Sequence, residues 1–193
     1  MTFRINYPKP DAPLIVVFCD SSCIVNKEKQ HYGLVWEAIL ADSNNNKLTK
    51  KIDQVIVPID EAPRKIIEYD GKLRSVYLGI EMVKKDYKLS DINLRIFTQQ
   101  FYAFYNRLFN QPRYFLRQDF VPRNGRDILW RSIIKDLRLV AGYEICTAYW
   151  TNEELELIRE SFFDTRRAAE KLAGVPPKAI DHYYGYNIAR IYV

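Results

Sequence analysis

Leu14–Asp20 reads LIVVFCD, six apolar residues followed directly by a carboxylate. Continuous β-branched and aromatic residues are typical of a strand that is buried on both faces of a sheet. A charge at the end of such a strand is expected where the sheet meets solvent. The stretch therefore predicts a central strand, and Asp20 is a candidate ligand or catalytic group at its edge.

The composition is that of a globular protein. The chain has 193 residues, of which 48% are hydrophobic. This length suits one domain, since single cores run to about 100–200 residues. Twenty-nine Lys and Arg residues against 24 Asp and Glu residues give a net charge of +5. This moderate positive excess allows binding to a polyanion but does not require it.

The three cysteines are Cys19, Cys23 and Cys146. Their number is odd and their spacing is not that of a Cys-x-x-Cys pair or a zinc site, which favours a reducing compartment. The chain shows no signal-peptide pattern after Met1 and no apolar run of the roughly 18 residues that a membrane span needs. We therefore expect a soluble intracellular protein with no membrane partner.

The first half of the chain predicts three successive strands. Asp42–Asn46 (DSNNN) supplies residues that tolerate a positive φ, so it should turn the chain from the second strand into the third. Short connections between successive strands predict an antiparallel meander. The predicted strands are 14–20, 31–41 and 47–57.

After Pro63 the apolar period becomes helical. Asp70-Gly71 is a weak point at which the first helix is expected to start or kink. Asn152 is the expected N-cap of the last helix, and Gly174 is its expected stop. The later predicted elements are a helix from about 64 to 85, a strand at 92–98, helices at 99–109 and 126–139, a strand at 142–149 and a helix at 152–173. In the helix at 126–139 the predicted apolar face is Ile128, Leu129, Ile133, Ile134 and Leu137.

The order of these elements, together with five short motifs, resembles the ribonuclease H family. The motifs occur in the family's order across roughly residues 13–174. They are Asp20–Cys23 (DSSC), which resembles a turn after the first strand, Tyr32–Val35 (YGLV) in the second strand, Leu73–Ile80 in the first helix, Asn124–Trp130 (NGRDILW) at the helix before strand five, and Ala169–Ala173 (AEKLA) in the last helix.

The resemblance implies an α/β fold, ribonuclease H-like, with a five-stranded mixed sheet flanked by helices. Three strands of this sheet are antiparallel and two are parallel. We divide the chain into an N-terminal arm (1–12), the ribonuclease H-like domain (13–174) and a C-terminal tail (175–193).

The resemblance also implies chemistry based on carboxylates. Ribonuclease H enzymes hold two Mg²⁺ ions about 3.5–4 Å apart, and carboxylate oxygens are the ligands that Mg²⁺ prefers. Matching the motifs residue by residue places Asp20, Lys72, Gln99 and Glu170 at the four acidic positions of the family. Only Asp20 and Glu170 keep an acid. With the positive charge of Lys72 and the neutral Gln99, the four positions carry a net charge of −1.

Lys72 argues against a metal. An ammonium about 4 Å from a divalent cation would be repelled by roughly 8 kcal/mol at an effective dielectric constant near 20. We expect Lys72 to pair with Asp20 in the place that a metal would take. The resemblance therefore predicts a domain without nuclease activity, metal or other cofactor.

A shifted helix register keeps an alternative open. Glu68 lies one turn before Lys72 on the same helical face, and with Asp20 and Glu170 it would supply Mg²⁺ ligands. Asp164 neighbours the fourth position and would serve as a fallback. The protein would then be an active Mg²⁺-dependent ribonuclease H that cleaves the RNA strand of RNA/DNA hybrids. Gln99 would remain deficient in either register.

The segment from Arg107 to Arg138 is rich in basic and aromatic residues. Arginines that neutralise phosphates, beside rings that stack on bases, suit sequence-tolerant nucleic-acid binding. In the resembling family this region carries a basic substrate-binding element. The alternative is that the rings are core residues and the arginines a solvated face. The candidate nucleic-acid-binding residues are Arg107, Arg113, Arg117, Arg123, Arg126 and Arg131, and the rings between them are Phe109, Tyr114, Phe115, Phe120 and Trp130.

We therefore expect a domain that binds RNA, DNA or their hybrid, or an assembly module in a nucleic-acid-processing complex. Related domains without catalytic acids act as connectors or scaffolds, for example beside reverse transcriptases. The tail at 175–193 ends in a strand-like run, Tyr183–Val193 (YYGYNIARIYV). Such a run would add to a sheet edge, in this molecule or in a protein partner.

Overall fold

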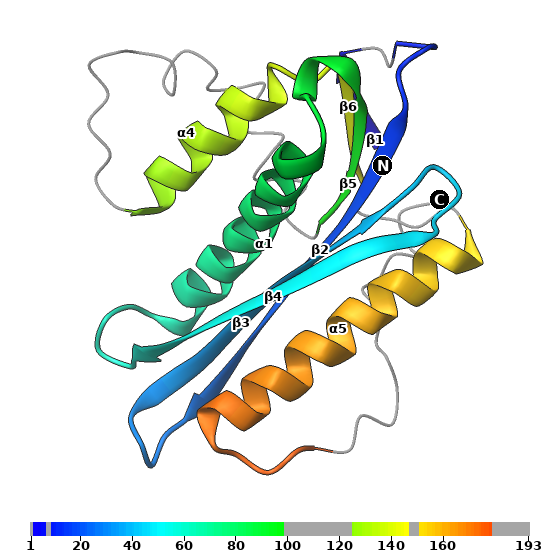
Figure 1. Ribbon diagram of the computed structural model, residues 1–193. Coiled ribbons are helices and arrows are strands. Elements are labelled where there is room, and N and C mark those ends of the chain that lie inside the picture. Colours follow the sequence, from blue (N-terminus) through cyan, green and yellow to red (C-terminus); the bar gives the residue numbers. More distant parts are fainter. Residues whose placement is uncertain (1, 7–8, 99–124, 147–150, 179–193) are drawn as a thin grey trace.

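In the computed structural model of the protein, residues 2–6, 9–98, 125–146 and 151–178 are described. The predicted helix at 99–109 and most of the predicted tail lie outside these residues. The described elements in chain order are β1 (Thr2–Asn6), β2 (Leu14–Asn26), β3 (His31–Ala41), β4 (Lys47–Pro58), α1 (Arg64–Asp86), a 3-10 turn (Leu89–Asp91), β5 (Asn93–Phe97), α4 (Gly125–Leu137), β6 (Gly142–Cys146) and α5 (Asn152–Ala173) (Figure 1).

The strands form one mixed sheet in the order β1-β6-β5-β2-β3-β4. β2, β3 and β4 are antiparallel neighbours, whereas β5 runs parallel to both β2 and β6. This confirms the predicted arrangement of three antiparallel and two parallel strands. The sixth strand, β1, comes from the segment predicted as an extended arm, and it pairs antiparallel with β6.

β2 is longer than the sequence predicted. It continues to Asn26 because β3 pairs with it over Val16–Asn26. The turn expected at Ser21–Cys23 is therefore wrong, since these residues pair with β3. β5 pairs with β2 only over Leu14–Phe18. Among the described strands, β3 alone pairs with the second half of β2.

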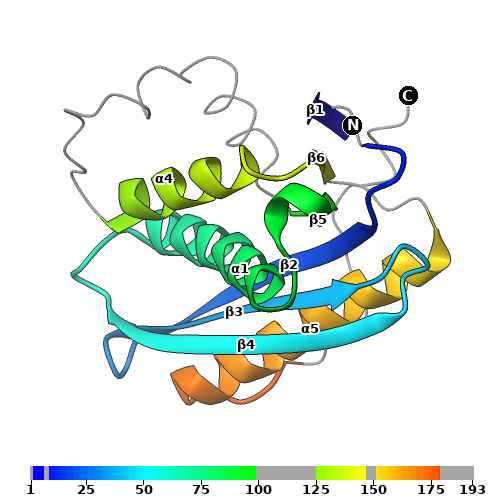
Figure 2. The ribbon, with the colours of Figure 1, turned by 45° about the horizontal axis from the view of Figure 1, so that its top comes forward.

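Helices cover both faces of the sheet. α1 and α4 lie on one face and α5 on the other (Figure 2). Side chains alternate between the faces along β2, so Val17 and Cys19 pack on the α1 side while Val16 and Phe18 pack on the α5 side. The run LIVVFCD is buried on both faces, as predicted. Among the helices of the described segments, none has the length and apolar character needed to cross a membrane.

α1 runs from Arg64 to Asp86 through Asp70 and Gly71, so the predicted start at this point is wrong. Gly71 serves close packing instead. A Cβ atom at this position would lie 2.6 Å from Leu34 Cδ1 and 3.2 Å from Ser21 Cβ. The absence of a side chain therefore lets α1 approach β2 and β3 closely.

α4 buries most of the predicted face, since Ile133, Ile134 and Leu137 are in the core and Leu129 packs against it, but Ile128 is not part of this face. Trp130 is 1% exposed and donates its indole N–H to the Tyr69 hydroxyl at 3.0 Å. Ile128, expected on the apolar face, is 58% exposed. Two residues correspond to about 200° of rotation in a helix, so Ile128 and Trp130 cannot share a face. The Trp130 ring therefore belongs to the core. For this residue, the alternative prediction of core packing instead of base stacking is confirmed.

α5 begins and ends with strong capping signals. Thr151 is the N-cap, and its hydroxyl accepts a hydrogen bond from the Glu154 N–H while the Glu154 carboxylate accepts one from the Thr151 N–H. The predicted cap at Asn152 is therefore one residue too late. Gly174 ends the helix in the left-handed conformation at φ 69°, which confirms the predicted stop.

Gly33→Ala tests the packing of α5 on β3. A Cβ atom on Gly33 would lie 2.8 Å from Ala169 O and 2.8 Å from Ala173 N, and these backbone atoms cannot move without displacing the helix. We expect the substitution to lower the free energy of unfolding by about 1–3 kcal/mol, the usual cost of overpacking. Urea denaturation followed by circular dichroism measures this loss.

Ser43→Ala in the exposed β3–β4 turn is the control for this experiment. We expect it to change the free energy of unfolding by less than about 0.5 kcal/mol. A Gly33→Ala protein that is as stable as the wild type contradicts the close approach of α5 to β3.

Candidate functional site

Asp20 lies within β2 and not at its end. It is 6% exposed, and its Oδ1 accepts a hydrogen bond from the Ser21 N–H at 2.7 Å. In the alternation along β2 it shares a face with Phe18 and Ser22, which lie against α5. The predicted position at a solvent-facing strand end is therefore wrong. β3 continues to pair beyond Asp20, so the residue is enclosed between the sheet and α5.

A second buried carboxylate lies directly opposite Asp20. Glu37 of β3 is its antiparallel pair, so both side chains are on the α5 face. Glu37 is 1% exposed, and its Oε2 has no hydrogen-bond partner among the described residues. Burial raises the pKa of Glu37 to about 7 against the opposing effect of the Ser161 hydroxyl, and the charges on β4 and α5 have smaller effects.

Sequence reasoning missed Glu37, although a signal was present. A lone carboxylate stands between Trp36 and Ala38 in a strand that is otherwise apolar. The tight turn between β2 and β3 pairs Asn26 with His31, and counting outward from this pair brings Glu37 opposite Asp20. The first strand was predicted to end at residue 20. The pairing of Asp20 with Glu37 could therefore not be deduced from the turn.

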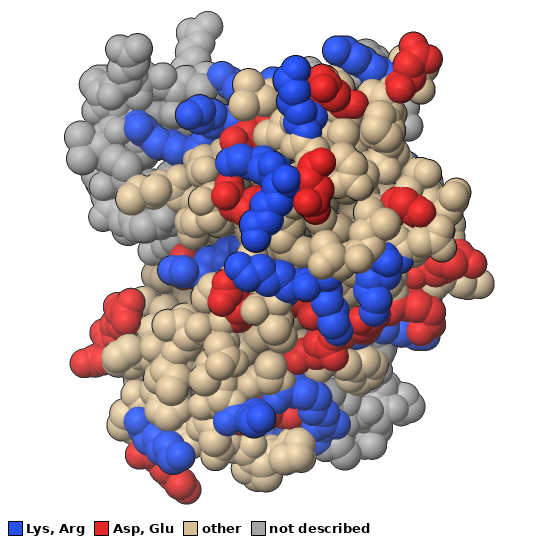
Figure 3. All heavy atoms as spheres, viewed as in Figure 1, with Lys and Arg blue, Asp and Glu red and all other residues tan. Residues whose placement is uncertain are grey.

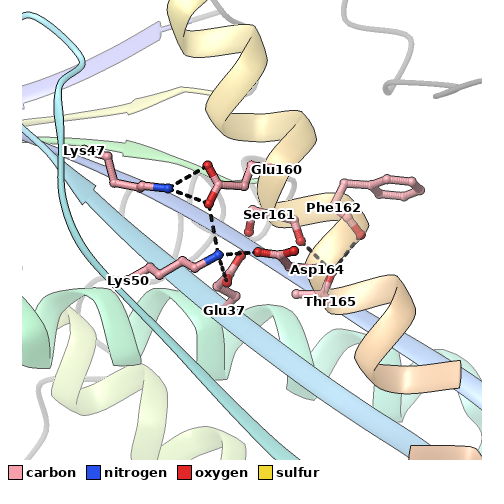
Figure 4. Close-up of polar contacts among 8 residues, drawn as sticks. All are labelled: Glu37, Lys47, Lys50, Glu160, Ser161, Phe162, Asp164 and Thr165. Carbon is pink, nitrogen blue, oxygen red and sulfur yellow. Dashed lines mark hydrogen bonds and ion pairs between the residues drawn. The ribbon is translucent and has the colours of Figure 1, made fainter. Parts of the chain in front are cut away.

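α5 and β4 add two acids and two lysines beside Glu37 (Figure 4). Lys47 Nζ lies 2.8 Å from Glu160 Oε1. Lys50 Nζ lies 3.0 Å from Glu160 Oε1, 2.5 Å from Asp164 Oδ2 and 4.0 Å from Glu37 Oε1. The Lys50 ammonium is therefore shared by carboxylates from β3 and α5.

The pKa values in this cluster follow from these contacts. Hydrogen bonds to Asp164 and Glu160 hold the pKa of Lys50 above its usual value. Burial of Glu160 raises its pKa, but hydrogen bonds from Lys47 and Lys50 outweigh this effect and leave the pKa of Glu160 below its usual value. Lys50 therefore stays charged at the point where the acids meet.

Lys72 lies on α1 next to Gly71, the residue that meets Ser21 of β2. α1 covers one face of β2, whereas the Asp20 side chain lies on the other face. This arrangement argues against the expected pair between Lys72 and Asp20.

Glu68 lies beside Cys23, farther along β2 than Asp20. Burial raises the pKa of the Cys23 thiol to about 11, with a further contribution from the charge of Glu68. The Glu68 carboxylate accepts a hydrogen bond from Arg64 Nε at 2.8 Å. Because Cys23 and Asp20 lie on opposite faces of β2, the structure does not bring Glu68 to Asp20.

Glu170 lies near the far end of α5. It is 2% exposed, and its carboxylate accepts hydrogen bonds from Arg166 Nε at 3.0 Å and Arg167 Nη1 at 3.1 Å. The neighbouring Ala169 packs on Ile24, which is four residues beyond Asp20 on β2. At about 3.3 Å per strand residue, Ile24 and Asp20 are about 13 Å apart along β2. Asp164, the fallback residue, is the predicted acid of α5 that joins the cluster around Glu37.

The described residues do not fit a site for two Mg²⁺ ions. Asp20, Glu68 and Glu170 point to different faces or different ends of the sheet, and Gln99 lies outside the described residues. Within the described segments, no three Asp, Glu, His or Cys side chains are arranged to hold a metal ion. No metal-dependent step can be derived from this arrangement.

The predicted nucleic-acid-binding segment is described only in part. Arg126 belongs to α4, but its side chain is not described. Arg131 is half-buried on α4, and Lys135 and Arg138 are exposed at and just beyond the end of this helix. Figure 3 shows basic side chains over this face of the molecule, interspersed with acidic ones. The candidates that lie outside the described residues are Arg107, Arg113, Arg117 and Arg123.

Comparison with solved structures identifies the class of fold. No protein-family model matches the sequence, and neither does any curated protein. The solved structures that are similar include ribonuclease H domains, and the chain has a ribonuclease H-like fold. This confirms the fold that the motifs predicted.

Three structures illustrate the similarity. The native protease-reverse transcriptase of prototype foamy virus aligns with a TM-score of 0.56 and 12% identity, covering 91% of this chain and 23% of the viral chain. LC9-RNase H1, a type 1 RNase H with the type 2 active-site motif, aligns with a TM-score of 0.53 and 15% identity over 87% of this chain and 78% of that chain. The isolated RNase H domain of prototype foamy virus has a TM-score of 0.50 and 14% identity over 84% of this chain and 96% of that domain. This chain therefore spans about a quarter of the full viral chain.

Glu37→Gln tests the buried carboxylate. Because the pKa of Glu37 is raised to about 7, the folded protein binds more protons than the unfolded protein between about pH 4.5 and pH 7, and stability falls as the pH rises through this range. The variant keeps the shape of the side chain without its charge. We expect it to be more stable than the wild type by about 2–3 kcal/mol at about pH 8, and equal to it near pH 4. Urea denaturation at the two pH values measures the difference.

Glu160→Gln is the matched control on α5. The pKa of Glu160 is lowered, so its charge stabilises the folded state above its usual pKa. This variant should lose stability at about pH 8, the opposite sign to Glu37→Gln. If Glu37→Gln is less stable than the wild type at about pH 8, the pKa of Glu37 is not raised.

Proposed function

We propose that this chain is a ribonuclease H-like domain that binds nucleic acid without cleaving it. The observation that carries the proposal is the position of Glu170. Its carboxylate is held by Arg166 and Arg167, and it lies near the end of α5 away from Asp20. The two remaining family positions hold Lys72 and Gln99, which carry no negative charge.

Lys50 supports the same conclusion. Its ammonium stands among Glu37, Glu160 and Asp164. A divalent cation about 4 Å from this ammonium would be repelled by roughly 8 kcal/mol at an effective dielectric constant near 20. A metal beside the Asp20–Glu37 pair would therefore have to displace Lys50 from its ion pairs. Lys50 of β4 thus places a positive charge near Glu37, the residue opposite Asp20.

Nucleic-acid binding is supported by the basic segment that leads into α4. Its candidate residues would neutralise phosphates, and each such contact adds to affinity in a salt-dependent way. A structure of the foamy viral protease-reverse transcriptase, similar to this chain with a TM-score of 0.50 and 13% identity, is in complex with dsDNA. We infer that the basic segment contacts the phosphates of a nucleic-acid strand.

A cleavage assay tests the absence of nuclease activity. We expect the purified protein to leave an RNA/DNA hybrid intact in the presence of Mg²⁺ or Mn²⁺, because the acids of the four positions do not converge. Asp20→Asn is the control for contaminating nuclease, which it would not affect. Metal-dependent cleavage that Asp20→Asn abolishes would show that the chain is an active ribonuclease H.

The salt dependence of binding tests the basic segment. The slope of log K against log salt falls by about 0.9 for each phosphate contact that is lost. We expect Arg113→Ala with Arg117→Ala to reduce the slope by about 2 for a fluorescent RNA/DNA hybrid, measured by anisotropy.

Lys27→Ala with Lys29→Ala removes the same charge from the exposed turn between β2 and β3. This control should leave the slope nearly unchanged. If both double variants reduce the slope equally, the binding reflects net charge and not the basic segment. A protein that does not bind the hybrid, single-stranded RNA or duplex DNA contradicts the proposed function, whatever the cleavage assay shows.

A further inference from the structure

β4 forms an open edge of the sheet (Figure 2). It is 12 residues long, and no other described strand pairs with its outer side. Four of its large apolar side chains are 38% to 52% exposed, namely Leu48, Ile52, Val55 and Ile56. A long edge strand with free backbone groups and exposed apolar side chains is a template for pairing with another strand.

The usual protection of an edge strand is missing over most of β4. Lysines commonly protect such edges because a second strand would have to bury their charge. Here Lys47 and Lys50 are bound by Glu160 and Asp164 of α5, so their ammonium groups are held over the sheet face (Figure 4). The segment Lys51–Val57 is left with two charged residues, Lys51 and Asp53, whose charges are opposite and lie 3.7 Å apart.

We propose that β4 pairs antiparallel with β4 of a second copy of this chain, about a two-fold axis at Ile52. In such a pair each contact occurs twice, and the same surface serves both copies. The opposed residues in this register are Ile52 with Ile52, Leu48 with Ile56, Thr49 with Val55, Lys50 with Gln54 and Lys51 with Asp53. Main-chain hydrogen bonds join the two sheets, and the side chains determine the register.

Charge complementarity selects this register. Lys51 and Asp53 are both about half exposed and lie 3.7 Å apart within one chain. Across the two-fold axis, each Lys51 faces Asp53 of the second copy. A shift that moves the axis by one residue places Lys51 opposite Lys51 or Asp53 opposite Asp53, and like charges directly opposite destabilise a strand pair.

The apolar side chains favour the same register. Ile52 lies opposite Glu37 and Ile56 lies opposite Gly33 on β3, so both are on the α5 face of the sheet. In the proposed register Ile52 meets Ile52 and Ile56 meets Leu48, so exposed apolar groups cover one another. The even-numbered residues of β4 lie on the α5 face and the odd-numbered ones on the α1 face. A register that pairs even with odd numbers would put the α5 face of one copy beside the α1 face of the other, so Leu48, Ile52 and Ile56 of the two copies would no longer meet.

Solution size tests the pairing. We expect the full chain to form a concentration-dependent dimer in analytical ultracentrifugation. Ile52→Lys would bring two ammonium groups together at the axis, so we expect it to weaken the dimer at least about tenfold. Lys85→Ala, on the exposed end of α1, is the control and should leave the dimer unchanged. A chain that stays monomeric at the highest soluble concentration overturns the proposal, including the case in which the tail of the same chain covers β4.

Disulfide cross-linking tests the register, and it does not depend on Ile52→Lys being folded. Ile52→Cys places the two thiols opposite each other, so mild oxidation should link the copies. Gln54→Cys on the same face would face Lys50 and should not link. The three native cysteines are buried and do not compete. A mixture of Leu48→Cys and Ile56→Cys proteins should link to each other. Equal linking at positions 52 and 54, or a dimer that Ile52→Lys leaves intact, overturns the proposed register.

Discussion

The unequal pairing of β2 is the constraint on which the rest of the structure depends. β3 pairs with β2 as far as Asn26, whereas β5 pairs with it only as far as Phe18. The stacked rings of Phe18 and Phe97, with centroids 4.8 Å apart, mark the end of the parallel pairing. Asp20 lies two residues beyond this point, where α5 closes one face of the strand. The position of the polar residues therefore follows from the different lengths of the two neighbouring strands.

The burial of carboxylates determines the electrostatics of the α5 face. A buried charge without a partner costs several kcal/mol, so buried acids in proteins are paired or become neutral. The buried Glu170 is paired with two arginines, and the partly exposed Glu160 is paired with two lysines. Glu37 has a more distant lysine, and its pKa rises instead. Each of these acids is therefore stabilised by partners close to its own position, and the acids described on α5 are spread along the helix.

Much of the fold could be predicted from local patterns. The run LIVVFCD predicted the central strand, and Gly174 predicted the end of α5. The turn residues of Asp42–Asn46 predicted the β3–β4 connection, where Asn45 has a φ of 63°. The candidate site was predicted less well, because a residue's position in the chain does not reveal which face it shares with a distant residue. Lys72 was expected beside Asp20, yet α1 lies on the other face of β2.

The amino-acid sequence by itself determined the order, type and approximate bounds of the described strands and helices from β2 onward, whereas β1 was expected to be an arm. It did so because periodicity, turn residues and helix stops act within a few residues of one another. Only the tertiary structure decided that Glu37 faces Asp20, that Lys50 joins the acids of α5, and that β4 is left as an open edge. Those outcomes depend on strand register and on how helices pack across the sheet, and both are set by contacts between residues that are far apart in the chain.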